Sequence, residues 1–244
     1  MGRRIVQVES GVLRIEQRLR IPGLEIGTDV SGPACIYAVV RARRGTVAYQ
    51  HGNTPVPAPP GFALFLPPFA LVQAALERCD VTSVAVAFRP HASDELPRQA
   101  VLLAENGPVP DSQHDVLERI RTTPILATIG REVDPAPLAL NAKTIIDQEY
   151  AVPLEIGRIA ARLGASPAIL SRTFRHAYGM PPVRYRHRVR VMEALMQFSD
   201  GAVPARVFQD VGFDDLSRFY KVFRTVTCAP PGSYRPLKSK TAKT

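Results

Sequence analysis

A 13-residue pattern occurs twice in the second half of this sequence, at positions 174–186 and again 49 residues later at 223–235. Both copies have Phe-Arg, five other residues, Pro-Pro, two other residues and Tyr-Arg. Six identities in register, in residue types as distinctive as these, are improbable by chance. A fixed internal period predicts that one supersecondary unit is duplicated, and this limits the folds open to the chain.

The first copy is predicted to be a helix, a tight turn and a second helix. Apolar residues recur at helical spacing over 154–163, and Gly164 then supplies a residue that can take a positive φ. Ser166 is a typical N-cap, with Pro167 at the first helical position, and the second helix runs through Tyr178. We therefore place a first helix-turn-helix motif at about 154–179.

The second copy has the same plan at about 204–228. Residues 205–211 form the short helix, Gly212 the turn, and 216–227 the second helix, with Asp215 as its cap. Residues 183–198 between the units can form one helix of ~24 Å. Two helix-turn-helix units that contact one face of DNA lie ~34 Å apart, and a linker helix of this length can set such a separation.

Each predicted second helix has an apolar side and a basic side. The apolar residues are spaced i, i+4 and should face inward: Leu170 and Phe174, then Phe219 and Phe223. The polar residues on the other side are Ser171, Arg172 and Arg175 in the first helix, and Ser217, Arg218, Lys221 and Arg224 in the second. Because Arg is the usual bidentate partner of guanine and Lys and Arg bind phosphates, this side is typical of DNA binding.

The charge of the chain supports the same function. Residues 1–136 hold 14 basic and 14 acidic residues, whereas residues 137–244 hold 17 basic and 8 acidic ones, the whole net excess of nine. A neutral half joined to a basic half is typical of a sensing or assembly module fused to a polyanion-binding one. The alternative, a helical bundle with solvated basic faces, does not explain why the duplicated unit carries the excess.

The first half has the period of β-strands. Residues 13–21 alternate between apolar and charged, and further strand-like runs occur at 36–41, 46–49, 62–66 and 81–88. Gly- and Pro-rich turns separate them, which predicts a small β-barrel or jelly roll. We therefore expect an α+β protein with a β-domain at 1–110, a helical connector at 111–136 that includes a short amphipathic helix, and an all-α domain at 137–244.

The stretch 211–215, with Ser217, Phe219, Phe223-Arg224 and the final Pro231 to Arg235, resembles the signature of AraC/XylS-type bacterial transcription regulators. Residues 137–236 resemble the whole DNA-binding domain of that family. The resemblance implies seven helices, two helix-turn-helix motifs and a linker helix. It also implies a promoter or operator in double-stranded DNA as the partner, and RNA polymerase as well if the protein is an activator.

The resemblance assigns base contacts to early positions of both recognition helices. The matching residues are Ala168, Ser171 and Arg172 in the first motif, and Ser217, Arg218 and Lys221 in the second. Arg175 and Arg224 match positions that suit backbone contacts, and Ser166 completes the predicted DNA-binding set. Two residues depart from the family pattern. Ala168 offers only a methyl contact, and Cys228 stands where many members have Gly or a small polar residue.

The first half is similar, less specifically, to the cupin-like effector domain of the family, above all at 60–67 after a Pro-Gly turn. Such domains bind a small-molecule effector, form a homodimer, or both, and the sequence leaves this choice open. Tyr37 and Tyr49 could line a pocket with their rings, but core packing is the favoured interpretation for both. Dimerisation through residues 111–122 is a further open alternative.

Other functions have weaker support. A cupin-type metal enzyme fused to a DNA-binding module would need clustered His and carboxylate ligands, but the five histidines form no HxH or HxxxH pair, and His51 alone lies in a predicted strand or turn. We therefore expect no enzyme, metal or cofactor. Cys35 precedes an apolar strand and is expected in the core rather than as a redox sensor. A DNA-binding protein of low sequence specificity remains an alternative.

The sequence also predicts where the protein acts. The N-terminal segment has no apolar region typical of a signal peptide, and the longest apolar run, 62–76, has only 15 residues and is interrupted by Pro67-Pro68. Three cysteines without CxxC spacing indicate neither a disulfide framework nor a zinc finger. We expect a soluble, cytoplasmic protein.

Overall fold

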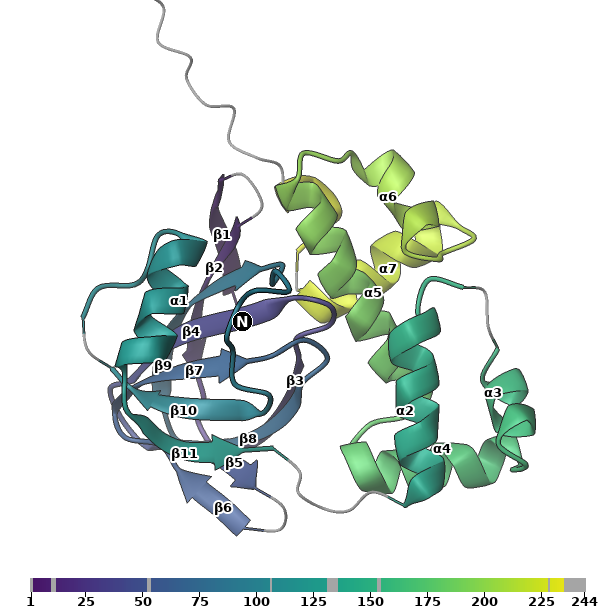
Figure 1. Ribbon diagram of the computed structural model, residues 1–244, viewed down its shortest axis with the longest axis horizontal. Helices are drawn as coiled ribbons and strands as arrows, with labels where there is room; N and C mark the ends of the chain where they lie inside the picture. The colour runs from purple at the N-terminus through teal and green to yellow at the C-terminus, as the bar shows by residue number, and fades with distance from the viewer. Residues whose placement is uncertain are drawn as a thin grey trace, which may run out of the picture.

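The computed structural model describes residues 2–9, 12–51, 54–105, 107–130, 136–152, 155–227 and 229–234. It has an N-terminal β-domain and a C-terminal helical domain that lie side by side (Figure 1). The fold is therefore α+β, with strands in the first half and helices in the second, as the sequence predicts.

The larger sheet of the β-domain has seven strands in the order β1-β2-β9-β4-β7-β10-β11, and each named pair is antiparallel. Its strands are β1 (Gly2–Glu9), β2 (Val12–Arg20), β4 (Cys35–Ala42), β7 (Gly61–Leu66), β9 (Asp80–Phe88), β10 (Ala100–Ala104) and β11 (Ile125–Ile129). The five strand-like runs of the sequence correspond to β2, β4, β5, β7 and β9, so those predictions are confirmed.

The smaller sheet has four antiparallel strands in the order β3-β8-β5-β6. Its strands are β3 (Leu24–Val30), β5 (Thr46–His51), β6 (Thr54–Pro57) and β8 (Leu71–Glu77). One core of the β-domain combines residues of both sheets, including Val40 and Leu64 of the larger and Val47 and Val72 of the smaller. The two sheets thus face each other across an apolar interior, as in the predicted jelly roll.

The predicted helical connector is only partly correct. Its amphipathic helix forms as α1 (Gln113–Thr122), which Ser112 caps by accepting a hydrogen bond from the Asp115 backbone N–H. The residues after it form β11, which pairs with β10 and extends the larger sheet. This strand was not expected, because Pro124 and a run of only five residues hide the strand period. The division into 1–110, 111–136 and 137–244 otherwise stays a prediction.

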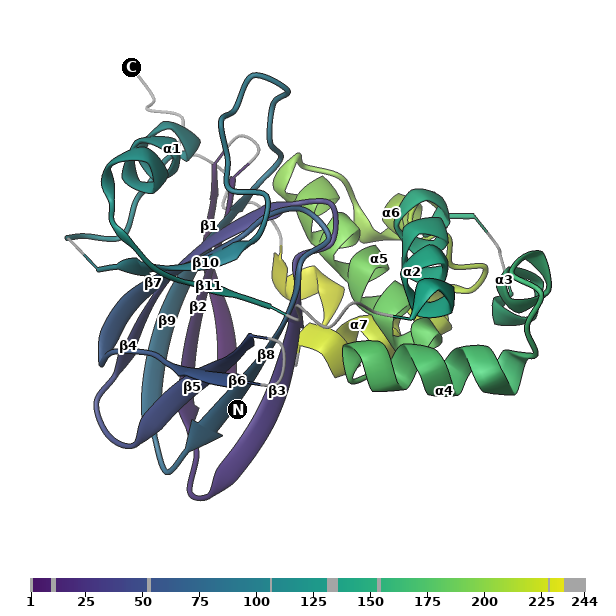
Figure 2. The same ribbon diagram turned by 60° about the horizontal axis from the view of Figure 1, so that its bottom comes forward.

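The helical domain contains six α-helices and a final 3-10 helix among its described residues, where the family resemblance implies seven helices. They are α2 (Pro137–Glu149), α3 (Ile156–Arg162), α4 (Pro167–Tyr178), α5 (Pro182–Ser199), α6 (Pro204–Asp210), α7 (Leu216–Thr227) and η1 (Pro231–Tyr234). The helix predicted between the units, 183–198, is α5. In Figure 2, α4 and α7 lie on one side of this domain, with α2 and α6 on the other.

The two domains share an apolar core. Leu13 and Ala87 of the larger sheet are fully buried in one cluster with residues of α5 and α7 such as Leu195 and Phe223. Polar contacts surround this cluster: the Arg89 guanidinium, just after β9, donates two hydrogen bonds to the Glu193 carboxylate of α5, at 3.0 and 2.8 Å. The linker helix α5 therefore connects the two recognition units and also anchors them to the β-domain.

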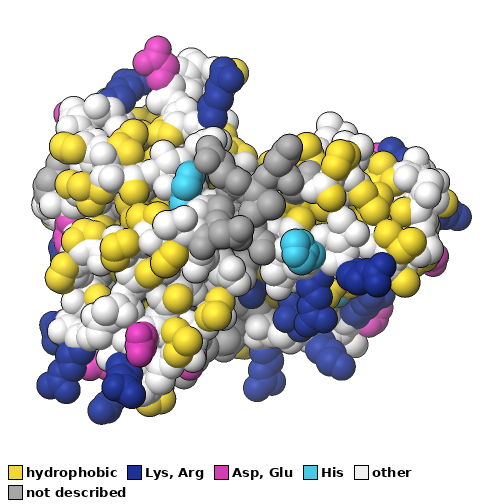
Figure 3. Space-filling model, turned by 90° about the horizontal axis from the view of Figure 1, so that it is seen from below, with side chains coloured by type: hydrophobic (Ala, Val, Ile, Leu, Met, Phe, Trp, Pro, Cys, Tyr) yellow, Lys and Arg dark blue, Asp and Glu magenta, His cyan; other side chains and the backbone are white. Residues whose placement is uncertain are grey.

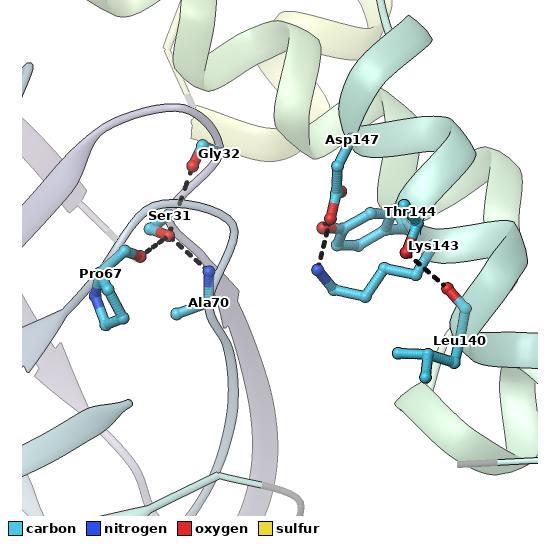
Figure 4. Close-up of polar contacts among 9 residues, drawn as sticks. Ser31, Gly32, Pro67, Ala70, Leu140, Lys143, Thr144 and Asp147 are labelled. Atoms are coloured by element: carbon cyan, nitrogen blue, oxygen red, sulfur yellow. Dashed lines mark hydrogen bonds and ion pairs between the residues drawn. The ribbon is translucent and has the colours of Figure 1, made fainter. Parts of the chain in front are cut away.

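A second polar arrangement shapes the loop of the β-domain that lies opposite α2. The buried Ser31 hydroxyl donates to the Pro67 carbonyl oxygen at 2.6 Å and accepts from the Ala70 backbone N–H at 2.9 Å. Figure 4 shows this loop across from Lys143 and Asp147 of α2. The hydrogen bonds hold the 67–70 turn in place, where Phe69 takes a positive φ of 57°.

Candidate nucleic-acid interface and the adjoining cavity

The first helix-turn-helix unit consists of α3 and α4. Gly164 in the turn has φ 66°, and Ser166 caps α4 by accepting a hydrogen bond from the Ile169 backbone N–H at 3.3 Å. Pro167 stands at the first helical position and Gly179 ends the helix with φ 71°. The predicted turn, cap and end of the first recognition helix are therefore confirmed. Leu154, the predicted start of the unit, lies outside the described residues.

The second unit, α6 and α7, has the same local plan. Gly212 takes φ 87° in the turn, and the Asp215 carboxylate accepts a hydrogen bond from the Arg218 backbone N–H at 2.7 Å, which caps α7. These contacts confirm the predicted turn and cap. The helix ends at Thr227, whose hydroxyl donates to backbone carbonyl oxygens of Phe223 and Ala229. Cys228 lies outside the described residues.

Each recognition helix buries its apolar side and exposes its basic side. Leu170, Phe174, Phe219 and Phe223 are all fully buried, as predicted. Of the nine predicted DNA-binding residues, Ser171 is half-buried and the others are exposed: Ser166, Ala168, Arg172, Arg175, Ser217, Arg218, Lys221 and Arg224. Figure 3 shows a group of Lys and Arg side chains on the helical half of the molecule and others at the edges of the β-domain. The assignment of these nine residues to DNA stays a prediction.

The linker helix adds positive charge beside the second unit. The His187 ring stacks on Phe213 with ring centres 5.9 Å apart, and the Arg190 guanidinium lies 5.2 Å from the same ring. Burial, and then the nearby Arg218 and other arginines, lower the pKa of His187 to about 4. The imidazole is therefore neutral at pH 7. Arg190 is buried and donates to the Tyr150 and Val152 carbonyl oxygens, whereas Arg218 is exposed and can attract a polyanion.

The linker helix is fixed to α2 by a largely buried polar group. The Tyr185 hydroxyl donates to the Asp147 carboxylate of α2 at 2.6 Å, and Lys143 donates to the same carboxylate at 2.6 Å. Burial raises the pKa of Asp147, an effect that Lys143 and Tyr185 oppose. Tyr185 belongs to the repeated pattern, and its side chain packs the linker helix against α2 and α4.

Sequence reasoning missed three apolar side chains on the recognition helices. Ile169 on α4 is 45% exposed, and Leu216 and Tyr220 on α7 are 39% and 40% exposed. The sequence pattern led to no prediction for these three residues, and helical geometry turns them away from the buried side. The signal that could have found them is angular position on the helix, since Ile169 lies closer to Arg172 than to Leu170 around the helix axis.

A cavity of about 400 Å³ lies between the two sheets and reaches the helical domain. Its walls are mostly apolar side chains of β2, β3, β4, β5, β7, β8 and β9, and the polar lining includes Gln17, Glu25, Thr28, Asp29, Tyr49 and Ser83. Arg188, Val191, Met192 and Leu195 of α5 and Thr225, Val226 and Thr227 of α7 complete the wall. A molecule in this cavity would touch both the sheets and the last turn of the second recognition helix.

The two candidate pocket tyrosines lie in different places. Tyr49 lines the cavity, and burial together with nearby Asp29 raises the pKa of its hydroxyl. Tyr37 does not line it and packs in the core, in agreement with the favoured interpretation. Residues alternate along β4, so that Ile36 and Ala38 face the cavity while Tyr37 packs on the opposite side of the sheet with Val116 of α1.

The remaining candidates are a cysteine and a histidine. Cys35 is fully buried in the core under α1, as predicted, and burial raises the pKa of its thiol to about 12. His51, at the end of β5, lines a separate cavity of about 230 Å³ with Phe69 and Lys143. Within the described ranges, no three His, Cys, Asp or Glu side chains are grouped so that they could hold a metal ion.

The chain matches a family of helix-turn-helix domains over residues 159–236. It is also 34% identical, over 82 residues, to the arabinose operon regulatory proteins of Salmonella typhimurium and Escherichia coli. These matches confirm that the helical domain is of the AraC/XylS helix-turn-helix type. The aligned part covers 33% of this chain and only 29% and 28% of those relatives, respectively.

The fold of the whole chain is similar to that of ToxT from Vibrio cholerae. A crystal form of ToxT aligns with 92% of this chain and 98% of its own at a TM-score of 0.50 and 9% identity. ToxT bound to (E)-4-(8-methylnaphthalen-1-yl)but-3-enoic acid gives the same coverage and TM-score at 11% identity. At this identity the likeness concerns the two-domain fold alone. These matches indicate no catalytic family, and no helix described by the structure is long and apolar enough to cross a membrane.

Proposed function

We propose that the protein is a sequence-specific transcription regulator of the cytoplasm that inserts α4 and α7 into adjacent major grooves of double-stranded DNA. The observation that carries the proposal is the duplication itself. Both recognition helices bury an apolar side and expose basic side chains, and the two helices lie on one side of the helical domain (Figure 2). A two-fold repeat of this kind is suited to a bipartite site with boxes about one helical turn apart.

In this proposal the exposed cations divide into two groups. Arg172, Arg218 and Lys221 lie in the first half of their helices, where side chains contact base edges. Arg175 and Arg224 lie one turn or more further along, where a guanidinium contacts backbone phosphates. The first group would determine sequence preference and the second would determine general affinity and its dependence on salt.

The cavity supports a second part of the proposal, control by a small molecule. Its volume and its wall, which is largely apolar but includes Glu25, Asp29 and Arg188, suit a ligand of moderate size that has an apolar body and a polar group. The ligand named for ToxT, a naphthalene carrying a short acid chain, is of this class. Because α7 forms part of the wall, such an effector would contact the DNA-binding domain directly. RNA polymerase, if the protein activates transcription, and a second copy of the chain are further partners in this proposal.

Selection from random double-stranded DNA with the full-length protein tests DNA recognition. At physiological salt we expect enrichment of two short boxes separated by about one helical turn, bound ~10³-fold or more tightly than random DNA. Binding without enrichment, abolished uniformly by salt, would instead identify a protein that coats DNA. Repeating the selection with cell extract metabolites added distinguishes that result from a protein held inactive by a missing effector.

The fluorescent dye 8-anilinonaphthalene-1-sulfonate can test the cavity. We expect one dye molecule to bind per chain with increased fluorescence, and binding to weaken in Ala38→Phe, which fills the space between the sheets. The control is Leu140→Phe on the surface of α2, where the native side chain is 46% exposed. Equal dye binding by both variants would contradict an effector site in the cavity.

A further inference from the structure

The first turn of α4 presents three consecutive apolar residues to solvent. Pro167, Ala168 and Ile169 are all exposed, and Ile169 keeps 45% of its surface accessible. Single exposed apolar residues are common on proteins. Here, however, they form the first turn of the recognition helix, the element of a helix-turn-helix motif that enters the DNA groove. They also precede Arg172 on the same exposed side of the helix.

The second recognition helix differs at the equivalent place. The first turn of α7 consists of Leu216, Ser217 and Arg218, and the last two carry hydrogen-bond donors on exposed side chains. Residues 167–169 of α4 carry no side-chain donor or acceptor. The base pairs beneath this turn therefore cannot be recognised by side-chain hydrogen bonds from these three residues.

The major groove offers one apolar group for such a surface. Each base pair presents donors and acceptors there, and thymine also presents its C5-methyl group. We propose that Ile169, with Ala168, recognises thymine methyl groups, so that the box bound by α4 contains thymine next to the base pair contacted by Arg172. This inference rests on the proposed DNA-binding function and adds the chemistry of one half of its site.

Replacement of thymine by deoxyuridine tests the inference, because it removes the methyl group and leaves every hydrogen-bonding group in place. The duplex recovered by selection is synthesised with each thymine replaced in turn, and binding is measured for the full-length protein and for Ile169→Ala. Burial of one methyl group corresponds to about fourfold in affinity. We expect at least one replacement to weaken binding of the native protein by about fourfold and to leave binding of Ile169→Ala unchanged.

Leu140→Ala is the matched control, since Leu140 of α2 is exposed to the same degree, 46%, in the same domain. It should respond to deoxyuridine like the native protein. The inference is overturned if the native protein and Ile169→Ala lose the same factor at every thymine, or if the selected boxes contain no thymine. Both results leave the proposed function intact. Absence of any enriched sequence would instead remove the proposed function and this inference together.

Discussion

The two helix-turn-helix units come from one repeated pattern but have different surroundings. The core around α4 consists mainly of residues of α2, α3 and α5, and Val30, Phe69 and Leu71 of the β-domain also pack in it. The core around α7 continues into the larger sheet through Leu13 and Ala87, and the last turn of α7 lines the cavity. The comparison indicates that the second unit is the one whose position an effector can influence directly.

The largest expected effect compares the turn glycines of the two units. A Cβ at Gly212 would lie 2.1 Å from the Ala151 carbonyl oxygen and 2.8 Å from Arg190 Nη2, whereas a Cβ at Gly164 meets nothing within 4 Å. Both residues have a positive φ. Gly212→Ala should therefore cost about 3 kcal/mol of folding stability or more, and Gly164→Ala about 1 kcal/mol.

Thermal and urea unfolding of the two variants measures this difference. The turn of the second unit packs closely against Ala151, just after α2, whereas the turn of the first unit has open space around it. This difference in packing is the reason that the two losses of folding stability should differ. Equal destabilisation would mean that the backbone strain common to both positions dominates and that the fit at Gly212 is unimportant.

The next effect compares DNA recognition by the two units. Arg172→Ala and Lys221→Ala should each reduce discrimination against a wrong base by about 1–3 kcal/mol. Both variants should keep some binding to random DNA. Arg175→Ala and Arg224→Ala should weaken binding to all sequences and reduce the slope of log affinity against log salt by about one. Equal loss of specificity in all four variants would contradict the proposed division into base and phosphate contacts.

A smaller effect concerns the anchor between the domains. Arg89→Ala leaves the largely buried Glu193 carboxylate without its two charged donors, and we expect a loss of about 2 kcal/mol in stability. Arg14→Ala is the control, because its partner Asp111 is 81% exposed and such a pair contributes less than about 1 kcal/mol. Chemical denaturation followed by circular dichroism measures both. A cost for Arg89→Ala no larger than for Arg14→Ala would show that the anchor is dispensable.

The smallest effect is a pH dependence confined to the second unit. The pKa of His187 is lowered from 6.5 to about 4, so the unfolded chain takes up a proton that the folded chain refuses between these values. Stability should therefore fall as the pH drops from about 6.5 to about 4, by about 1 kcal/mol because the ring is partly exposed. His187→Phe should flatten this part of the pH profile, and a profile that this substitution leaves unchanged would contradict the prediction.

Sequence period and local chemistry predicted most of the fold. The repeat, the helix caps and the turn glycines gave both recognition units, because these features depend on neighbouring residues alone. Strands β3 and β8 were missed because the first has an exposed apolar pattern, with Leu24 and Ile26 each 64% accessible, and the second lies directly after Pro67-Pro68. Strand β11 depends on pairing with β10, a contact that no local pattern contains.

The sequence predicted more about the DNA-binding residues than about the cavity. Exposure of Arg172 or Lys221 follows from the helix period, since the buried Leu and Phe residues fix the opposite side. The cavity is formed by residues far apart in sequence, such as Gln17 of β2, Tyr49 of β5 and Thr225 of α7. Tyr37 and Tyr49 both lie in apolar strand segments of the sequence, and only the register of each strand decides which of them faces the cavity.

The core shared by the sheet and α5 has a consequence for how this protein can be divided or recombined. Leu13 and Ala87 of the larger sheet and Leu195 of α5 are buried in one cluster, so separating the halves after residue 130 would expose apolar surface on both. A chimera that joins either half to a foreign partner would therefore have to supply a complementary apolar face. Exchange of regulatory modules therefore depends on complementary apolar surfaces as well as on the length of the connecting segment.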